Sequence, residues 1–170
     1  MEITEKDKRE TIRIDQIITK IDKIDEDYIK KEMDIIFNQQ PFLISLIMGY
    51  SLDLKPEELE EMMKITLIIW EYFKDNEKIK KKKVTENQFE TIQKRNIHLI
   101  KYFEGEVGKA DKSKLLESDL SHLSSKALLA GIFLRFNTQY ALTRIKKETR
   151  GILLIGIKSL IESLEEIEKS

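Results

Sequence analysis

Few residues of this chain are suited to acid–base or metal chemistry. It has two histidines, His98 and His122, and no cysteine. Asp119 precedes His122 by three residues, which places both on one helix face and matches half of the carboxylate–histidine pattern of di-iron bundles. Arg95 stands where a second such unit needs a carboxylate before His98. We therefore interpret Asp119 and His122 as a surface pair near a helix start and expect no cofactor. An enzyme or metal-binding bundle that uses Asp119, His122 or His98 is kept as the third and least favoured alternative.

Serines form a second cluster, comprising Ser118, Ser121, Ser124 and Ser125. A nucleophilic serine needs an activating base and a strained turn, and no glycine-flanked serine elbow occurs in the sequence. Glycine-rich phosphate-binding motifs are also missing from it. These serines are typical of helix caps, and the sequence favours a non-catalytic protein over an enzyme.

Lysines dominate one short segment, which contains Lys78, Lys80, Lys81, Lys82 and Lys83. Lysines near aromatic side chains such as Tyr72 and Phe73 are able to grip nucleic acid. The run has no arginine, however, and the chain has 30 basic against 31 acidic residues, so no global field attracts an anionic polymer. We expect a solvated surface here, and keep a regulator that contacts nucleic acid through these lysines as the alternative.

The C-terminal region carries a heptad pattern of apolar residues. The pattern consists of Leu153, Ile157, Leu160, Leu164 and Ile167. Such a seam packs either inside its own bundle or against a second chain across a two-fold axis. We favour packing inside the bundle, and keep a homodimer or a protein partner as the alternative.

Aromatic side chains offer one further kind of site. Trp70, Tyr72, Phe73, Phe133 and Phe136 are able to line a pocket for a small apolar ligand between helices. At helical spacing such residues more often belong to the core, so we rank a small-ligand-binding bundle below an interaction protein.

These residues must be positioned by helices, because apolar residues recur at three- and four-residue spacing through a chain with only two prolines and six glycines. We predict an all-α bundle of about six helices. Their expected ranges are 10–38, 41–49, 56–73, a helix from about 85 to 103, one containing 127–136, and one from about 139 or 143 to 168.

Two or three of these helices should be nearly fully buried at the centre, namely those at 41–50, 127–136 and 151–164. Ala127 and Gly131 lie four apart on one face and should admit a close helix, and we expect close packing at Gly151 and Gly156. We predict a single domain over residues 1–170, in which residues 1–24 are a detachable helical arm. Residues 105–113 are the expected mobile connection.

The composition and the distribution of apolar residues exclude several classes of protein. Hydrophobic residues make up 41% of the chain, which excludes overall disorder. The longest mostly apolar stretch, Pro41 to Leu52, is too short to cross a bilayer, and the first ten residues mix charges of both signs where an export signal needs an apolar stretch. We expect a cytoplasmic, non-membrane protein that acts as an interaction or scaffold protein, able to self-associate.

Overall fold

The computed structural model describes residues 4–104, 119 and 121–170, and every regular element within these ranges is a helix. The predicted all-α class is confirmed. The elements are α1 (Glu5–Ile21), α2 (Glu26–Gln39), α3 (Pro41–Tyr50), the 3-10 turn η1 (Ser51–Asp53), α4 (Pro56–Phe73), α5 (Glu77–Lys81), α6 (Glu86–Glu104), α8 (Lys126–Thr138), α9 (Tyr140–Thr143) and α10 (Lys147–Lys169). The connection expected at 105–113 lies outside the described residues.

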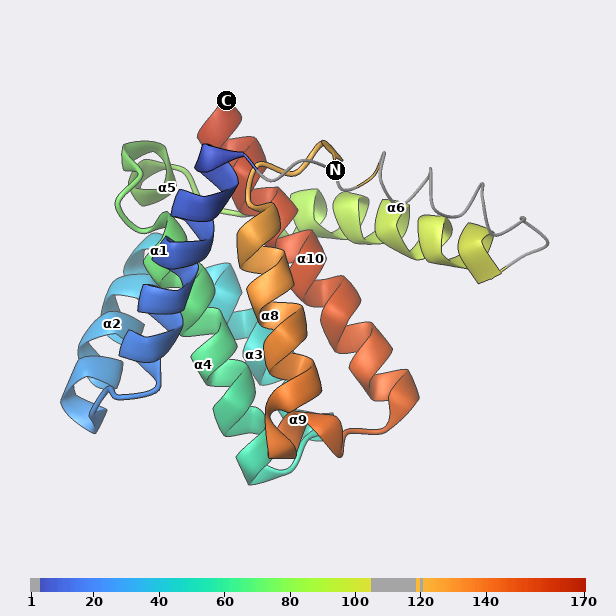
Figure 1. The fold of residues 1–170 in the computed structure, drawn as a ribbon, viewed down its shortest axis with the longest axis horizontal. Helices are drawn as coiled ribbons and strands as arrows, with labels where there is room; N and C mark the ends of the chain where they lie inside the picture. The colour runs from blue at the N-terminus through green and yellow to red at the C-terminus, as the bar shows by residue number, and fades with distance from the viewer. Residues whose placement is uncertain (1–3, 105–118, 120) are drawn as a thin grey trace.

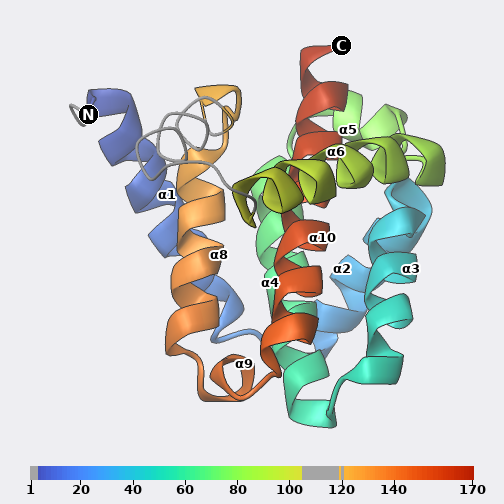
Figure 2. The same ribbon diagram turned by 90° about the vertical axis from the view of Figure 1, so that its right-hand side faces the viewer.

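Helices α1, α4, α8 and α10 run from top to bottom in the view of Figure 1, across the longest axis of the molecule, and α3 packs against both α2 and α4. Helix α6 instead crosses α10 and extends sideways from the bundle (Figures 1 and 2). The short α9 turns the chain from the end of α8 into α10. The beginning of α1 and the end of α10 lie at the same end of the bundle, opposite α9 (Figure 2).

The centre of the core is formed by α4 and α10. In α4 the run from Ile65 to Trp70 is buried on every side, and Phe73 extends it. In α10 nearly every residue from Gly156 to Glu165 is buried. These two helices therefore supply most of the apolar surface that folding removes from water.

We expected α3 and α8 to be nearly fully buried at the centre of the bundle. This is wrong, because one side of each helix is exposed to solvent. Helix α3 buries Leu43 and Ile47, but Met48 is 61% exposed. Helix α8 buries Leu128 and Ile132, but Leu134 is 64% exposed. Both helices are apolar nearly all round, and the sequence does not indicate which side stays outside the core.

The single first helix predicted over 10–38 is also wrong, because α1 and α2 are separate. Asp22 ends α1 and pairs with the buried Arg135 of α8, and Asp25 caps α2 by accepting a hydrogen bond from the Tyr28 backbone N–H at 2.8 Å. The apolar spacing continues across the break, which is why periodicity alone hides it. N-cap aspartates favour a helix start over continuation.

Two glycines allow close helix contacts. A Cβ at Gly131 of α8 would lie 2.8 Å from Cγ2 of Ile14, so α1 approaches α8 as expected from the Ala127–Gly131 spacing. A Cβ at Gly156 would lie 1.8 Å from the Tyr50 hydroxyl oxygen. Gly151 has no atom within 4 Å of its Cβ position, so the close packing expected there is wrong.

Polar contacts fasten α1 to the rest of the bundle. Arg135 is 4% exposed and donates to both carboxylate oxygens of Asp22, at 2.7 and 3.2 Å, and to Glu61 of α4 at 3.0 Å. On the neighbouring face, Lys20 pairs with Glu71 at 2.9 Å. Whether residues 1–24 detach stays a prediction. None of the described helices combines the length and the apolar character that a bilayer crossing requires.

Candidate functional site

The histidines and Asp119 do not come together as a reactive group. The Nδ1 atom of His98 lies 2.7 Å from the Lys94 carbonyl oxygen, and the Asp119 carboxylate pairs with Lys158 at 3.1 Å. The His122 side chain is exposed. Among the residues that the structure describes, no group of three or more His, Cys, Asp or Glu side chains is arranged to hold a metal ion.

The serines have a structural role at the start of α8. The Ser125 backbone N–H donates to Glu165 of α10 at 2.7 Å, the Ser125 hydroxyl donates to the same carboxylate, and Ser124 N–H lies 3.1 Å from it. Ser125 is the N-cap residue of α8, but its hydroxyl makes no capping bond to the helix, so the predicted side-chain capping is wrong at this position. The hydroxyl binds the Glu165 carboxylate instead. Ser118 lies outside the described residues.

The heptad seam of α10 is internal in this chain. Leu153, Ile157, Leu160, Leu164 and Ile167 are each between 0 and 3% exposed. Helix α10 packs against α5, α6 and α8. A second chain would reach these side chains only if α10 left its place in the bundle, so self-association through the seam stays a prediction.

The lysine segment forms α5 and the residues after it. The Lys78 ammonium group donates to the Glu168 carbonyl oxygen near the end of α10, Lys80 pairs with Glu77, and Lys82 donates to the Ser170 hydroxyl. Cations at this place complement the C-terminal end of the α10 dipole. Lys81 and Lys83 remain exposed beside them.

The aromatic residues do not line one pocket together. Trp70, Phe73 and Phe136 are 0 to 1% exposed and belong to the core, and Trp70 donates its ring N–H to Glu32 at 2.8 Å. Tyr72 bonds to Glu10 and stacks under the guanidinium group of Arg13. Phe133 alone lies at the surface site described next.

An open groove of about 670 Å³ lies between α6, α8 and α10. Leu99 and Ile100 contribute from α6, and Leu129 and Phe133 contribute from α8. The α10 side consists of Lys147, Glu148, Gly151, Ile152, Leu154, Ile155 and Lys158, and Asn96 and Asp119 complete the lining. Three of its apolar side chains are exposed to solvent in large part, Ile100 at 39%, Phe133 at 36% and Ile152 at 56%.

Gly151 makes the groove deeper on the α10 side. Among the described residues, no neighbouring atom lies within 4 Å of the Cβ position at Gly151. From Lys147 to Lys158 the groove follows α10 for about 17 Å at the rise of an α-helix. It therefore offers about three turns of apolar surface to an occupant.

One end of the groove is closed by a polar cluster. The buried side chain of Asn96 donates to Glu162 at 2.6 Å and accepts from Lys158 at 2.8 Å. Lys158 also pairs with Glu162 at 2.7 Å and with Asp119. Arg95 pairs with Glu162 at 3.3 Å as well, so the two cations and two carboxylates of this cluster balance and this end is close to neutral.

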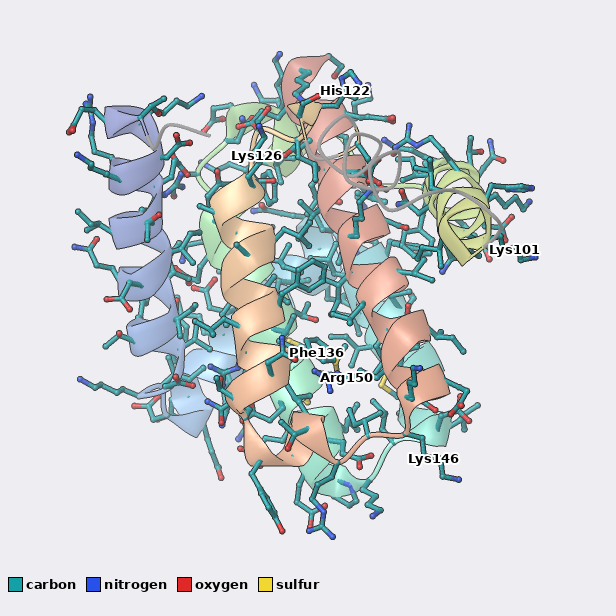
Figure 3. All side chains as sticks on the ribbon, turned by 45° about the vertical axis from the view of Figure 1, so that its right-hand side comes forward. Lys101, His122, Lys126, Phe136, Lys146 and Arg150 are labelled. Carbon is teal, nitrogen blue, oxygen red and sulfur yellow. The ribbon has the colours of Figure 1, made fainter. Side chains whose placement is uncertain are left out.

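The other end of the groove is lined by Lys147, which belongs to a basic segment at the beginning of α10. The sequence from Arg144 to Arg150 has four cationic residues, Arg144, Lys146, Lys147 and Arg150, and one acidic residue, Glu148. Arg150 extends between α8 and α10 and donates to the Phe136 carbonyl oxygen at 3.0 Å and to the Asn137 side-chain oxygen, and Lys146 lies at the beginning of α10 (Figure 3). In the described part of the chain none of these four cations has a carboxylate within salt-bridge distance.

Sequence reasoning missed this groove. It concentrated on the heptad seam of the last helix, whereas the groove uses the residues beside that seam, Gly151, Ile152 and Ile155. The available signal was the excess of apolar residues in the last helix over those that the seam accounts for. The basic segment 144–150 was also readable, since cations at a helix start oppose the helix dipole.

Comparisons with known proteins do not identify this chain. No protein-family model matches it, and neither do the curated proteins or the solved structures that were searched. Its function must be argued from its own surface.

Proposed function

We propose that this chain is a non-catalytic interaction protein that binds a helical segment of a partner protein in the groove between α6, α8 and α10. The main support for this proposal is that three solvent-exposed apolar side chains, each from a different helix, line the same concave site. These side chains are Ile100, Phe133 and Ile152. Burying apolar surface contributes roughly 25 cal/mol per Å², so a partner that covers these side chains gains binding free energy.

The shape of the groove favours a helix as its occupant. An amphipathic helix docks through apolar residues at positions i, i+3, i+4 and i+7, which span about 10 Å, and the groove runs for about 17 Å along α10. Its volume also lies within the range of small-ligand pockets, so a small apolar molecule is the competing occupant. A second copy of this chain is able to supply the helix, which keeps the homodimer within the proposal.

Replacing Gly151 with tryptophan tests the proposal, because Gly151 lines the groove and its Cβ position has open space around it, so that a large side chain there should occupy the groove. Gly49 is a matched control: it is also helical, has no atom within 4 Å of its Cβ position, and is absent from the groove lining. Helical peptides are first selected on the wild-type protein from a displayed library. Their affinities for the wild type, Gly151→Trp and Gly49→Trp are then measured by fluorescence anisotropy.

We expect the selected peptides to bind the wild type and Gly49→Trp with affinities within about twofold of each other. Gly151→Trp should lose about tenfold or more, which corresponds to about 1.4 kcal/mol of binding free energy. Failure to select any peptide, or equal binding to Gly151→Trp, would refute a helix-binding groove. Circular dichroism confirms that both variants fold.

A further inference from the structure

The charges around the groove specify the partner more closely. At the end where α10 begins, Lys146, Lys147 and Arg150 outnumber the single carboxylate of Glu148. Lys147 itself lines the groove, and both lysines are exposed. The opposite end carries no comparable excess, because Lys158 is paired with Asp119 and Glu162.

These lysines do not serve the stability of their own helix. Lys146 is the N-cap residue of α10 without a side-chain capping bond, and Lys147 is the first helical residue. Cations here face the positive end of the helix dipole, an unfavourable place for them. Among the described residues, the groove lining contains one other basic residue besides Lys147, and this residue, Lys158, is paired with carboxylates.

We infer that the groove takes an acidic amphipathic helix, whose apolar face contacts Phe133, Ile152 and Ile155 while its carboxylates meet Lys147 in the lining and the adjacent exposed Lys146. This inference rests on the proposed function, since it assumes that a helix occupies the groove. The apolar floor supplies affinity and the basic end selects among helices by charge, because complementary charge gives specificity and like charge repels.

Two synthetic peptides of roughly 18 residues, or five helical turns, form the test. Both have leucine at positions i, i+3, i+4 and i+7 of the helix, so that the leucines form one apolar face. One carries glutamate on its polar face and the other carries lysine. Their binding to the wild type, Gly151→Trp, the double variant Lys146→Gln/Lys147→Gln and the control Lys81→Gln/Lys83→Gln is followed by fluorescence anisotropy. The control removes the same charge from two exposed lysines far from the groove lining.

We expect the glutamate peptide to bind the wild type and the lysine-run control equally. It should bind the Lys146→Gln/Lys147→Gln variant about five- to tenfold more weakly, as expected for two solvent-exposed ion pairs. Raised salt should weaken binding to the wild type more than binding to that variant, because the lost pairs are the screened ones. Gly151→Trp should lose binding, and the lysine peptide should bind poorly throughout.

The remaining outcomes separate the two ideas. Equal binding of both peptides, lost in Gly151→Trp, overturns the preference for acid and leaves the helix-binding groove in place. Binding of the glutamate peptide that survives in Gly151→Trp shows contact with surface charge alone and overturns the inference. No binding of either peptide, together with a failed library selection, removes both. Tighter binding to phosphatidylserine vesicles than to the glutamate peptide would make an anionic lipid surface the partner instead.

Discussion

Tyr50 packs so closely on Gly156 that no side chain larger than a hydrogen atom fits at position 156. The Tyr50 ring ends against the α10 backbone at Gly156, and its hydroxyl is buried without a hydrogen-bond partner in the described residues. Burial raises the pKa of the Tyr50 hydroxyl to about 12. Burying a hydroxyl without a hydrogen-bond partner costs free energy. The close packing of α3 on α10 at this contact must offset that cost.

Gly156→Ala should therefore destabilise the fold by about 2 kcal/mol, because the new methyl group overlaps the Tyr50 hydroxyl. Gly151→Ala is the matched control: it should stabilise by up to about 1 kcal/mol, since alanine is the better helix former and nothing obstructs it. Urea unfolding followed by circular dichroism measures both. Equal effects at the two positions would contradict the contact.

Tyr50→Phe probes the same contact from the other side. Removing the unpaired hydroxyl should leave the free energy of unfolding unchanged or raise it by about 1 kcal/mol. It should also recover part of the loss in the Tyr50→Phe/Gly156→Ala double variant, because the closest atom to the new methyl is gone.

At the scale of elements, the lysine segment is held in place by one buried side chain. The Gln40 amide nitrogen donates to the carbonyl oxygens of Ile79 and Lys82 at 2.6 and 2.7 Å, and its oxygen accepts from Val84 N–H at 2.9 Å. Gln40 is fully buried at the junction of α2 and α3. A five-residue helix is not stable alone, so this clasp determines the path of α5.

Gln40→Met should cost about 3 kcal/mol, because it leaves the buried Val84 N–H and two carbonyl groups without their partner. Gln39→Met is the control at the preceding position, where the side-chain oxygen has no hydrogen-bond partner among the described residues, and it should change stability by no more than about 0.5 kcal/mol. Hydrogen exchange should show faster exchange over residues 77–84 in the first variant alone. Unchanged exchange there would show that the clasp is dispensable.

Across the whole molecule, Glu165 links the end of α10 to the beginning of α8. Burial acts to raise the pKa of this carboxyl, but hydrogen bonds from Ser125, Lys169 and Ser124 outweigh it and hold the pKa below its ordinary value. A carboxyl with a depressed pKa in the folded state stabilises the fold above the ordinary glutamate pKa of about 4.3. That contribution is lost as the pH falls from this value through the folded-state pKa.

Glu165→Gln should accordingly lower the free energy of unfolding by about 2 kcal/mol at neutral pH. The difference from the wild type should shrink steadily once the pH falls below about 4.3. Glu60→Gln, at a side chain that is 69% exposed, should follow the wild-type curve. Urea unfolding across the acid range measures all three, and a difference independent of pH would contradict the role of the ionised carboxylate.

The basic end and the apolar groove also belong to the molecular scale, because they combine α6, α8, α9 and α10. Arg150 reaches α8 from α10 only because α9 turns the chain back at this end of the bundle. The binding tests on Gly151, Lys146 and Lys147 therefore examine an arrangement that no single helix contains.

Local features were readable from the sequence. The first turns at Pro41 and Pro56, the start of α6 after Thr85, and the close approach at Gly131 all follow from short-range rules of capping and side-chain size. The break between α1 and α2 was also encoded locally, in Asp22 and Asp25, but the continuing apolar spacing masked it.

The sequence by itself determined that the chain is helical and where α3, α4 and α6 begin, because these properties depend on neighbours within a few residues. Only the tertiary structure decided that the α10 seam is internal and that Met48 and Leu134 are exposed. It also decided that Phe133, Gly151 and Ile152 share a groove beside a basic end. A helix that is apolar on most sides does not specify which side it buries, since that depends on partners far away in the chain.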